Sequence, residues 1–116
     1  MAELPDNLRR ELPALSIGEA LETHLAKFMS LEDDGVTFLV RNGVGWLPGV
    51  VGEVRVQALE GTPERYSLDS GGAVISTDIA TETRFHYHDF QTRNGVQAFV
   101  NVLVYGATET RPFGIF

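Results

Sequence analysis

IATETRFHYHDFQTRNGVQAFVNVLVYG, residues Ile79–Gly106, is the stretch whose pattern decides the predicted fold. Asn94-Gly95 lies near its middle, and both residues accept the positive φ that a type I′ turn requires. We therefore predict one long β-hairpin closed at this pair. The two-residue loop sets Arg93 opposite Val96 and fixes the register of every pair behind it.

Alternate residues of a strand share a face, so the predicted hairpin has two faces that differ in composition. The first is almost wholly apolar and is expected to lie on the core: Phe85, Tyr87, Val96, Ala98, Val100, Val102 and Val104. The second mixes charged, polar and large apolar groups: Glu82, Arg84, His86, His88, Phe90, Phe99, Asn101, Leu103 and Tyr105. Such a mixture suits neither a core nor a solvated face and predicts a pocket or a partner interface.

A helix is predicted ahead of the strands. Ser16–Glu19 has the pattern of a capping box, and the helix is expected to run from about Ile17 to Met29. Its apolar stripe is made of Ile17, Ala20, Leu21, Leu25 and Phe28. The predicted fold class is therefore α+β, with one amphipathic N-terminal helix packed on a four- to six-stranded antiparallel sheet. An all-β sandwich or barrel with a peripheral helix is the alternative.

The remaining segments are short and separated by turns, which favours antiparallel pairing. Strands are expected at 36–41, 50–59, 65–68 and 73–77. With 116 residues the chain is predicted to be a single domain, 1–116. Residues 1–15 are expected to form an arm or a short helix. The apolar tail, 107–116, is expected to dock on its own domain as an edge strand or to insert into a neighbouring subunit.

Composition bounds the function. The chain has no cysteine, which excludes disulfides and thiol catalysis and fits a cytoplasmic or virion location. Its formal net charge is −7, so nucleic acid and anionic membrane surfaces are not expected as partners. No apolar run approaches the roughly 18–20 residues that cross a bilayer.

The two histidines of the mixed face allow two kinds of chemistry. His86 and His88 would lie roughly 6–7 Å apart along one strand face, which resembles the metal-bearing strand of the cupin family. No later histidine and no matching downstream carboxylate completes such a site, so neither a metal nor another cofactor is predicted. An acid–base site of His86, His88 and Glu82 is the stronger possibility. The pocket expected around this acid–base site is similar to the cone-shaped pockets of cystatin-like and NTF2-like folds.

Trp46 stands in the glycine- and proline-rich segment Asn42–Gly49. A tryptophan in a surface loop is a typical binding hot spot, and a plug that closes one end of the core is the alternative.

These features together predict a non-enzymatic interaction or assembly module that self-associates into a homo-oligomer. A small virion or phage structural component, or an adaptor, fits this description. The expected binding residues are Arg84, His86, His88, Phe99, Asn101, Leu103, Tyr105 and Trp46. The alternative is a small-molecule-binding protein or acid–base enzyme with a pocket lined by Glu82, Arg84, His86 and His88.

Overall fold

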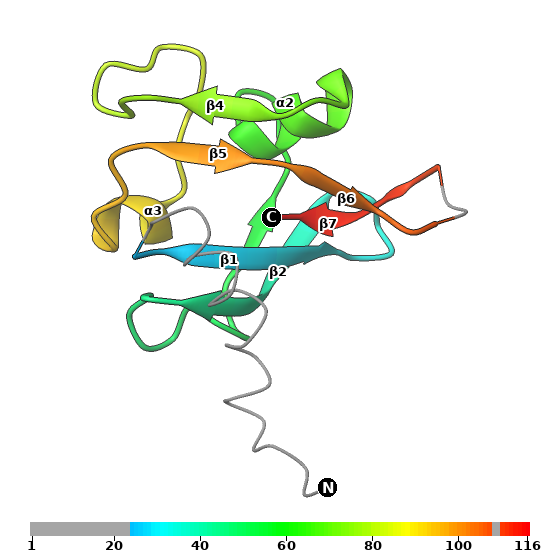
Figure 1. Ribbon diagram of the computed structural model, residues 1–116, viewed down its shortest axis with the longest axis horizontal. Helices are drawn as coiled ribbons and strands as arrows, with labels where there is room; N and C mark the ends of the chain where they lie inside the picture. Colours follow the sequence, from blue (N-terminus) through cyan, green and yellow to red (C-terminus); the bar gives the residue numbers. More distant parts are fainter. Residues whose placement is uncertain (1–23, 108–109) are drawn as a thin grey trace, which may run out of the picture.

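The computed structural model describes residues 24–107 and 110–116. In these residues the elements follow one another as β1 (Ala26–Leu31), β2 (Thr37–Val44), β3 (Arg55–Gln57), α2 (Pro63–Ser70), β4 (Val74–Ser76), α3 (Asp89–Arg93), β5 (Phe99–Asn101), β6 (Leu103–Tyr105) and β7 (Pro112–Ile115). Five strands form one sheet in the order β3-β2-β1-β7-β6, and β4 and β5 form a second, two-stranded sheet (Figure 1). All the pairs are antiparallel.

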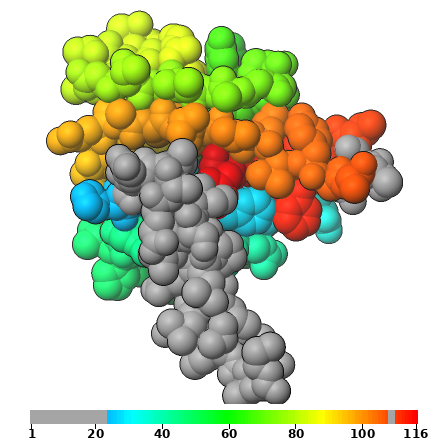
Figure 2. Space-filling view, in the orientation of Figure 1, coloured from blue at the N-terminus to red at the C-terminus, as the bar shows by residue number. Residues whose placement is uncertain are grey.

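The two sheets are joined through the chain from Phe99 to Tyr105. Val102, between β5 and β6, donates its N–H to the carbonyl of Phe116 and accepts from the N–H of Phe116, both at 2.8 Å. The segment therefore behaves as one long strand that pairs with β4 at one end and with β7 at the other. In Figure 2 it is the orange band that crosses the visible face.

The predicted fold class is wrong. Where the predicted helix should end, Ala26–Leu31 forms the central strand β1. Met29 belongs to the core, and Lys27, two positions before it in the strand, is buried as well. Pairing with β2 along the whole of this segment overrides the helical spacing that Leu25 and Phe28 suggested. The rest of the predicted helix and the predicted arm, 1–15, fall outside the described residues.

The prediction of a hairpin closed at Asn94-Gly95 is also wrong. Asp89–Arg93 forms the short helix α3, and Asn94 ends it with φ −91°, so Gly95 alone has a positive φ, 73°. A single left-handed glycine after a helical turn is a common way to end a helix, whereas a type I′ turn needs two such residues. β5 consequently pairs with β4, with Phe99 opposite Ser76 and Asn101 opposite Val74.

The core lies on the face of the large sheet against which α3 and Val50 pack. Phe90 of α3 is buried there and packs on Trp46, with ring centroids 5.6 Å apart. Phe38, at 0 % exposure, occupies the middle of this layer. The buried members of the core are Met29, Phe38, Val40, Val50, Val56, Ala58, Phe90 and Ile115.

The apolar tail docks on its own domain, but in the interior of the sheet. β7 lies between β1 and β6, with Met29 opposite Ile115. A Cβ at Gly114 would lie 2.7 Å from the ring of Phe28, so glycine lets this ring cross β7 and stack on Phe113. No helix in the described residues has the length and apolar character needed to span a bilayer.

Candidate ligand-binding cleft

An open cleft of about 830 Å³ lies where the edge strand β3 meets the segment that precedes α3. Glu32 and Thr37, at the ends of β1 and β2, form its floor together with Arg55 of β3. Glu60, in the connection to α2, and His88, ahead of α3, line it from other sides. Four separate parts of the chain therefore contribute to one concave surface.

Gly61 fixes the wall that carries the histidines. The N–H of His86 donates to the carbonyl of Gly61 at 2.6 Å, which ties residues 86–88 to the connection before α2. Gly61 has φ +88°, and a Cβ there would lie 2.9 Å from Cδ2 of the His86 ring. Only glycine satisfies both conditions without strain, so this position sets how His86 lies against the cleft.

His88 connects the cleft to a buried carboxylate. Its Nε2 lies 3.1 Å from Oε2 of Glu64, and the Glu64 side chain is fully buried. The N–H of His88 also donates to Oε1 of Gln91, at 3.2 Å, which fixes the backbone of the histidine. Oε1 of Glu64 has no hydrogen-bond partner among the described residues. A carboxylate so placed orients the imidazole.

Glu64 reaches this position because it lies in the first turn of α2, whose N-terminus has typical capping residues. Thr62 is the N-cap, and its hydroxyl accepts from the N–H of Arg65 at 3.2 Å. Pro63 follows, where its fixed φ suits the first turn and no donor is lost. Glu64 is next, and a carboxylate in the first turn is favoured by the helix dipole.

Lys27 faces the same carboxylate from β1. Its side chain is buried, with 9 % of the residue exposed, and its ammonium makes no hydrogen bond or ion pair with the described part of the chain. Burial lowers the pKa of Lys27, and the charge of Glu64 opposes this effect only in part. The interior beside the cleft thus holds an amine and a carboxylate with no hydrogen bond or ion pair between them.

A clamp of Glu82 and Arg84 holds the segment that leads to the histidines. The guanidinium of Arg84 donates to both oxygens of Glu82, each at 2.9 Å, and to the carbonyl of Ile75 at 2.8 Å. It also lies 4.7 Å from the centroid of the Phe85 ring. The hydrogen bonds from Arg84, assisted by one from the Ser76 hydroxyl, lower the pKa of Glu82 to about 2. The carboxylate is therefore ionised and structural at neutral pH.

The structure brings together only some of the residues predicted to form the site. His86 and His88 share the cleft, while Glu82 and Arg84 pair with each other and do not line it. Phe99 packs against Phe85 and Tyr87, and Asn101 is buried with no partner for Nδ2 among the described residues.

Three more of the predicted residues lie elsewhere. Leu103 packs on the core, and Tyr105 lies 46 % exposed in β6. Trp46 donates its indole N–H to the carbonyl of Ala26 at 2.8 Å and packs on the core. Trp46 is half-buried, and the structure shows its contact with the core.

Sequence reasoning missed Glu64 and Lys27. The segment 60–64 was expected to be a turn and 65–68 a strand, whereas Pro63–Ser70 is the helix α2. Thr62-Pro63-Glu64 does carry a helix-start signal, namely a capping residue, a proline and an acid. Nothing in the sequence marks Lys27 as buried, because it was expected to lie in the predicted helix, outside its apolar stripe. No group of three or more His, Cys, Asp or Glu in the described ranges could hold a metal ion.

Comparison with known proteins identifies the architecture. Neither a family model nor a curated protein matches the sequence. Solved structures do match. The GAF domain of the Acinetobacter phosphoenolpyruvate-protein phosphotransferase aligns over 98% of this chain with a TM-score of 0.71 and 17% identity. The corresponding domain from Coxiella burnetii aligns over 98% with a TM-score of 0.73 and 14% identity. This chain has a GAF-like fold.

A further match with this GAF-like fold is an enzyme. The free methionine-R-sulfoxide reductase of Neisseria meningitidis, solved in complex with its substrate, aligns over 97% of this chain with a TM-score of 0.65 and 13% identity. The chain spans 65%, 66% and 61% of these three structures, so it corresponds to under two thirds of each. At these identities the likeness establishes the fold alone.

Proposed function

We propose that this GAF-like chain is a small-molecule-binding module whose ligand enters the cleft and contacts His88. The observation that carries the proposal is the Glu64 carboxylate. It is fully buried, it meets the cleft-lining His88 through one oxygen, and its other oxygen has no partner among the described residues. A buried charge that is only partly satisfied costs stability, and such groups cluster at functional sites.

The size of the cleft and one structural neighbour support this proposal. Its volume of about 830 Å³ falls within the range of small-molecule sites, roughly 300–1,000 Å³. The reductase from N. meningitidis accommodates its substrate on the same fold. Because this chain has no cysteine, its own residues cannot supply thiol chemistry, and we propose binding rather than reduction.

A metabolite screen read by amide NMR tests the proposal. We expect at least one compound to shift the amides of residues 55–62 and 86–88 together. The variants Glu64→Gln and His88→Gln should each weaken this ligand about tenfold or more, because each leaves a buried polar group without its partner. Two variants are used so that a folding defect in one does not decide the result.

The matched control is His24→Gln, because His24 is exposed and does not line the cleft. This variant should bind the ligand as the wild type does. If no compound shifts the cleft amides, or if the ligand binds equally well to all three variants, the proposed function is wrong.

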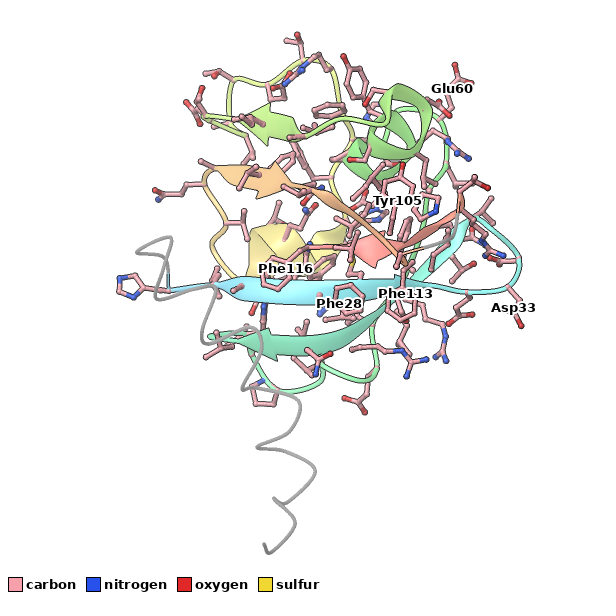
Figure 3. All side chains as sticks on the ribbon, turned by 45° about the vertical axis from the view of Figure 1, so that its right-hand side comes forward. Phe28, Asp33, Glu60, Tyr105, Phe113 and Phe116 are labelled. Atoms are coloured by element: carbon pink, nitrogen blue, oxygen red, sulfur yellow. The ribbon has the colours of Figure 1, made fainter. Side chains whose placement is uncertain are left out.

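A second candidate function is the self-associating interaction module, and one observation favours it. Ile75 of β4 and Val100 of β5 are direct cross-strand partners and remain 58% and 43% exposed, with Val102 beside them at 46%. Phe28, Phe113, Phe116 and Tyr105 lie along the adjoining part of the sheet (Figure 3). A contiguous exposed apolar surface is typical of an interface.

Light scattering over a concentration series tests self-association. A homo-oligomer should dissociate in the double variant Ile75→Ser/Val100→Ser, while Leu59→Ser, an equally exposed apolar position elsewhere, should leave the assembly unchanged. A protein that stays monomeric at high concentration would contradict this function without affecting the cleft.

A further inference from the structure

We propose that the ligand of the cleft is a small organic cation, such as one bearing an ammonium or amidinium group. This inference rests on the proposed function and names its ligand class. Three features support it: the charges around the cleft, the buried Glu64 carboxylate next to it and the aromatic rings that line it.

The positive charge in the cleft is already neutralised. Nε of Arg55 lies 2.7 Å from Oε1 of Glu32, so this guanidinium is paired. Arg111 donates to the carbonyl of Glu32 and lies near Asp34, whose pKa is lowered by hydrogen bonds from Thr37 and Val36 and, less strongly, by the charge of Arg111. Each arginine therefore has an acidic neighbour, and neither is free to attract an anion.

The negative charge, in contrast, is not neutralised. Glu60 lines the cleft and is exposed, and within the described residues its carboxylate makes no hydrogen bond or ion pair. Figure 3 shows it beside α2. With a net charge of −7, the whole chain adds to the attraction of a cation.

Glu64 provides a second, independent observation. Its Oε2 lies 3.1 Å from Nε2 of the cleft-lining His88, and its Oε1 is buried and accepts no hydrogen bond from the described residues. Lys27 faces Glu64 from β1, but burial favours the neutral form of this lysine, so it offsets the carboxylate only in part. The charge of this carboxylate lies directly behind a cleft-lining residue, so it attracts a cation in the cleft and repels an anion.

The rings of Tyr87 and His86 complete the cleft. An aromatic face attracts a cation within about 6 Å of its centre, and tyrosine is among the better partners. A flat cation would therefore meet the exposed carboxylate of Glu60 and a ring surface in the cleft, next to the histidine that contacts the buried Glu64.

Three probes of the same shape and different charge test this inference. Benzamidine is cationic, benzamide is neutral and benzoate is anionic. Each is titrated into the full chain at neutral pH and low salt, with cleft amide shifts as the readout. We expect benzamidine to bind at residues 55–62 and 86–88 at least about tenfold more tightly than benzamide, and benzoate not to bind there.

Variants of two carboxylates give the matched control. Glu60→Gln should weaken benzamidine about two- to fivefold, as expected for an exposed charge. Glu53→Gln removes an exposed carboxylate that does not line the cleft and should change nothing. Added salt should weaken benzamidine and leave benzamide unaffected.

The failures of the two proposals can be told apart. If benzamide or benzoate binds as tightly as benzamidine, or if the screen yields only neutral or anionic ligands at the cleft, the ligand class is wrong and the binding function stands. If neither the probes nor the screen shifts the cleft amides, both proposals are wrong.

Discussion

Two regions of this chain are held in place by different forces. The strands β1, β2 and β7 pair over their length and bury residues such as Met29 and Ile115 completely. The segment from Asp78 to His88 has little regular structure and is held by polar contacts, chiefly Glu82 with Arg84 and His86 with Gly61. Apolar burial thus sets the fold, and a few hydrogen bonds set the wall of the cleft.

This difference predicts that changes in the two regions will have different consequences. Changes in the sheet should affect global stability, whereas changes in the polar segment should affect the cleft and leave the fold in place. The buried charges of Lys27 and Glu64 lie between the two regions, since one belongs to the sheet and the other to α2.

The largest effect is expected for Phe38→Ala. Phe38 is fully buried in the core, so the change removes its transfer free energy and leaves a cavity. We expect the free energy of unfolding to fall by about 3–5 kcal/mol in urea denaturation. Leu59→Ala, at a residue 58% exposed, should change it by less than about 0.5 kcal/mol. If both variants lowered the free energy of unfolding by the same amount, Phe38 would not lie in the core.

A smaller effect of opposite sign is expected for Lys27→Met. Burial lowers the pKa of Lys27, so the unfolded chain binds this proton more readily than the folded chain. The resulting penalty is full below the folded-state pKa and disappears as pH rises towards 10.5, the value for an unperturbed lysine. The variant should therefore be more stable at neutral pH, by about 1–2 kcal/mol, with the gain shrinking at alkaline pH.

Arg93→Met, at an exposed residue of α3, is the control and should show no such gain. A loss of stability in Lys27→Met would mean instead that Lys27 and Glu64 stabilise each other directly.

The smallest effect on global stability is expected for Glu82→Gln. Its folded-state pKa of about 2 lies below the ordinary value of 4.5, so its stabilising contribution is present above pH 4.5 and lost as pH falls towards 2. The melting temperature should be slightly lower than that of the wild type at pH 7 and equal to it near pH 2. Amide exchange should rise in residues 78–88 and stay unchanged in β1 and β2. A uniform rise over the whole chain would contradict local control of this segment.

The sequence predicted the parts of the fold whose local pattern agrees with their final environment. Thr37–Val44 lies where a strand was expected, and so does Val74–Ser76, because both are bounded by turn residues. Three of the failures have one physical cause. Ala26–Leu31, Pro63–Ser70 and Asp89–Arg93 are short, and in each a long-range contact or a cap decides between competing local patterns.

The candidate site was predictable only in part. His86 and His88 were predicted as site residues because they share the mixed face of the expected hairpin, and both line the cleft. Their spacing could not reveal Glu64, which lies 24 residues before His88 and reaches it through the packing of α2. The predicted partners of these histidines on the hairpin, Asn101 and Leu103, depended on a turn that does not form.

The histidine side chains provide the most direct test of the central claim that Glu64 holds His88 at a ligand site. Long-range ¹H–¹⁵N spectra resolve the tautomer of each imidazole, and they can be recorded with and without the best ligand of the screen. We predict that His88 is held in one form with a slowly exchanging proton on Nε2. Ligand should shift His88 and His86 while His24 stays unchanged. Three histidines with the same mixture of tautomers and no response to any ligand would contradict the account.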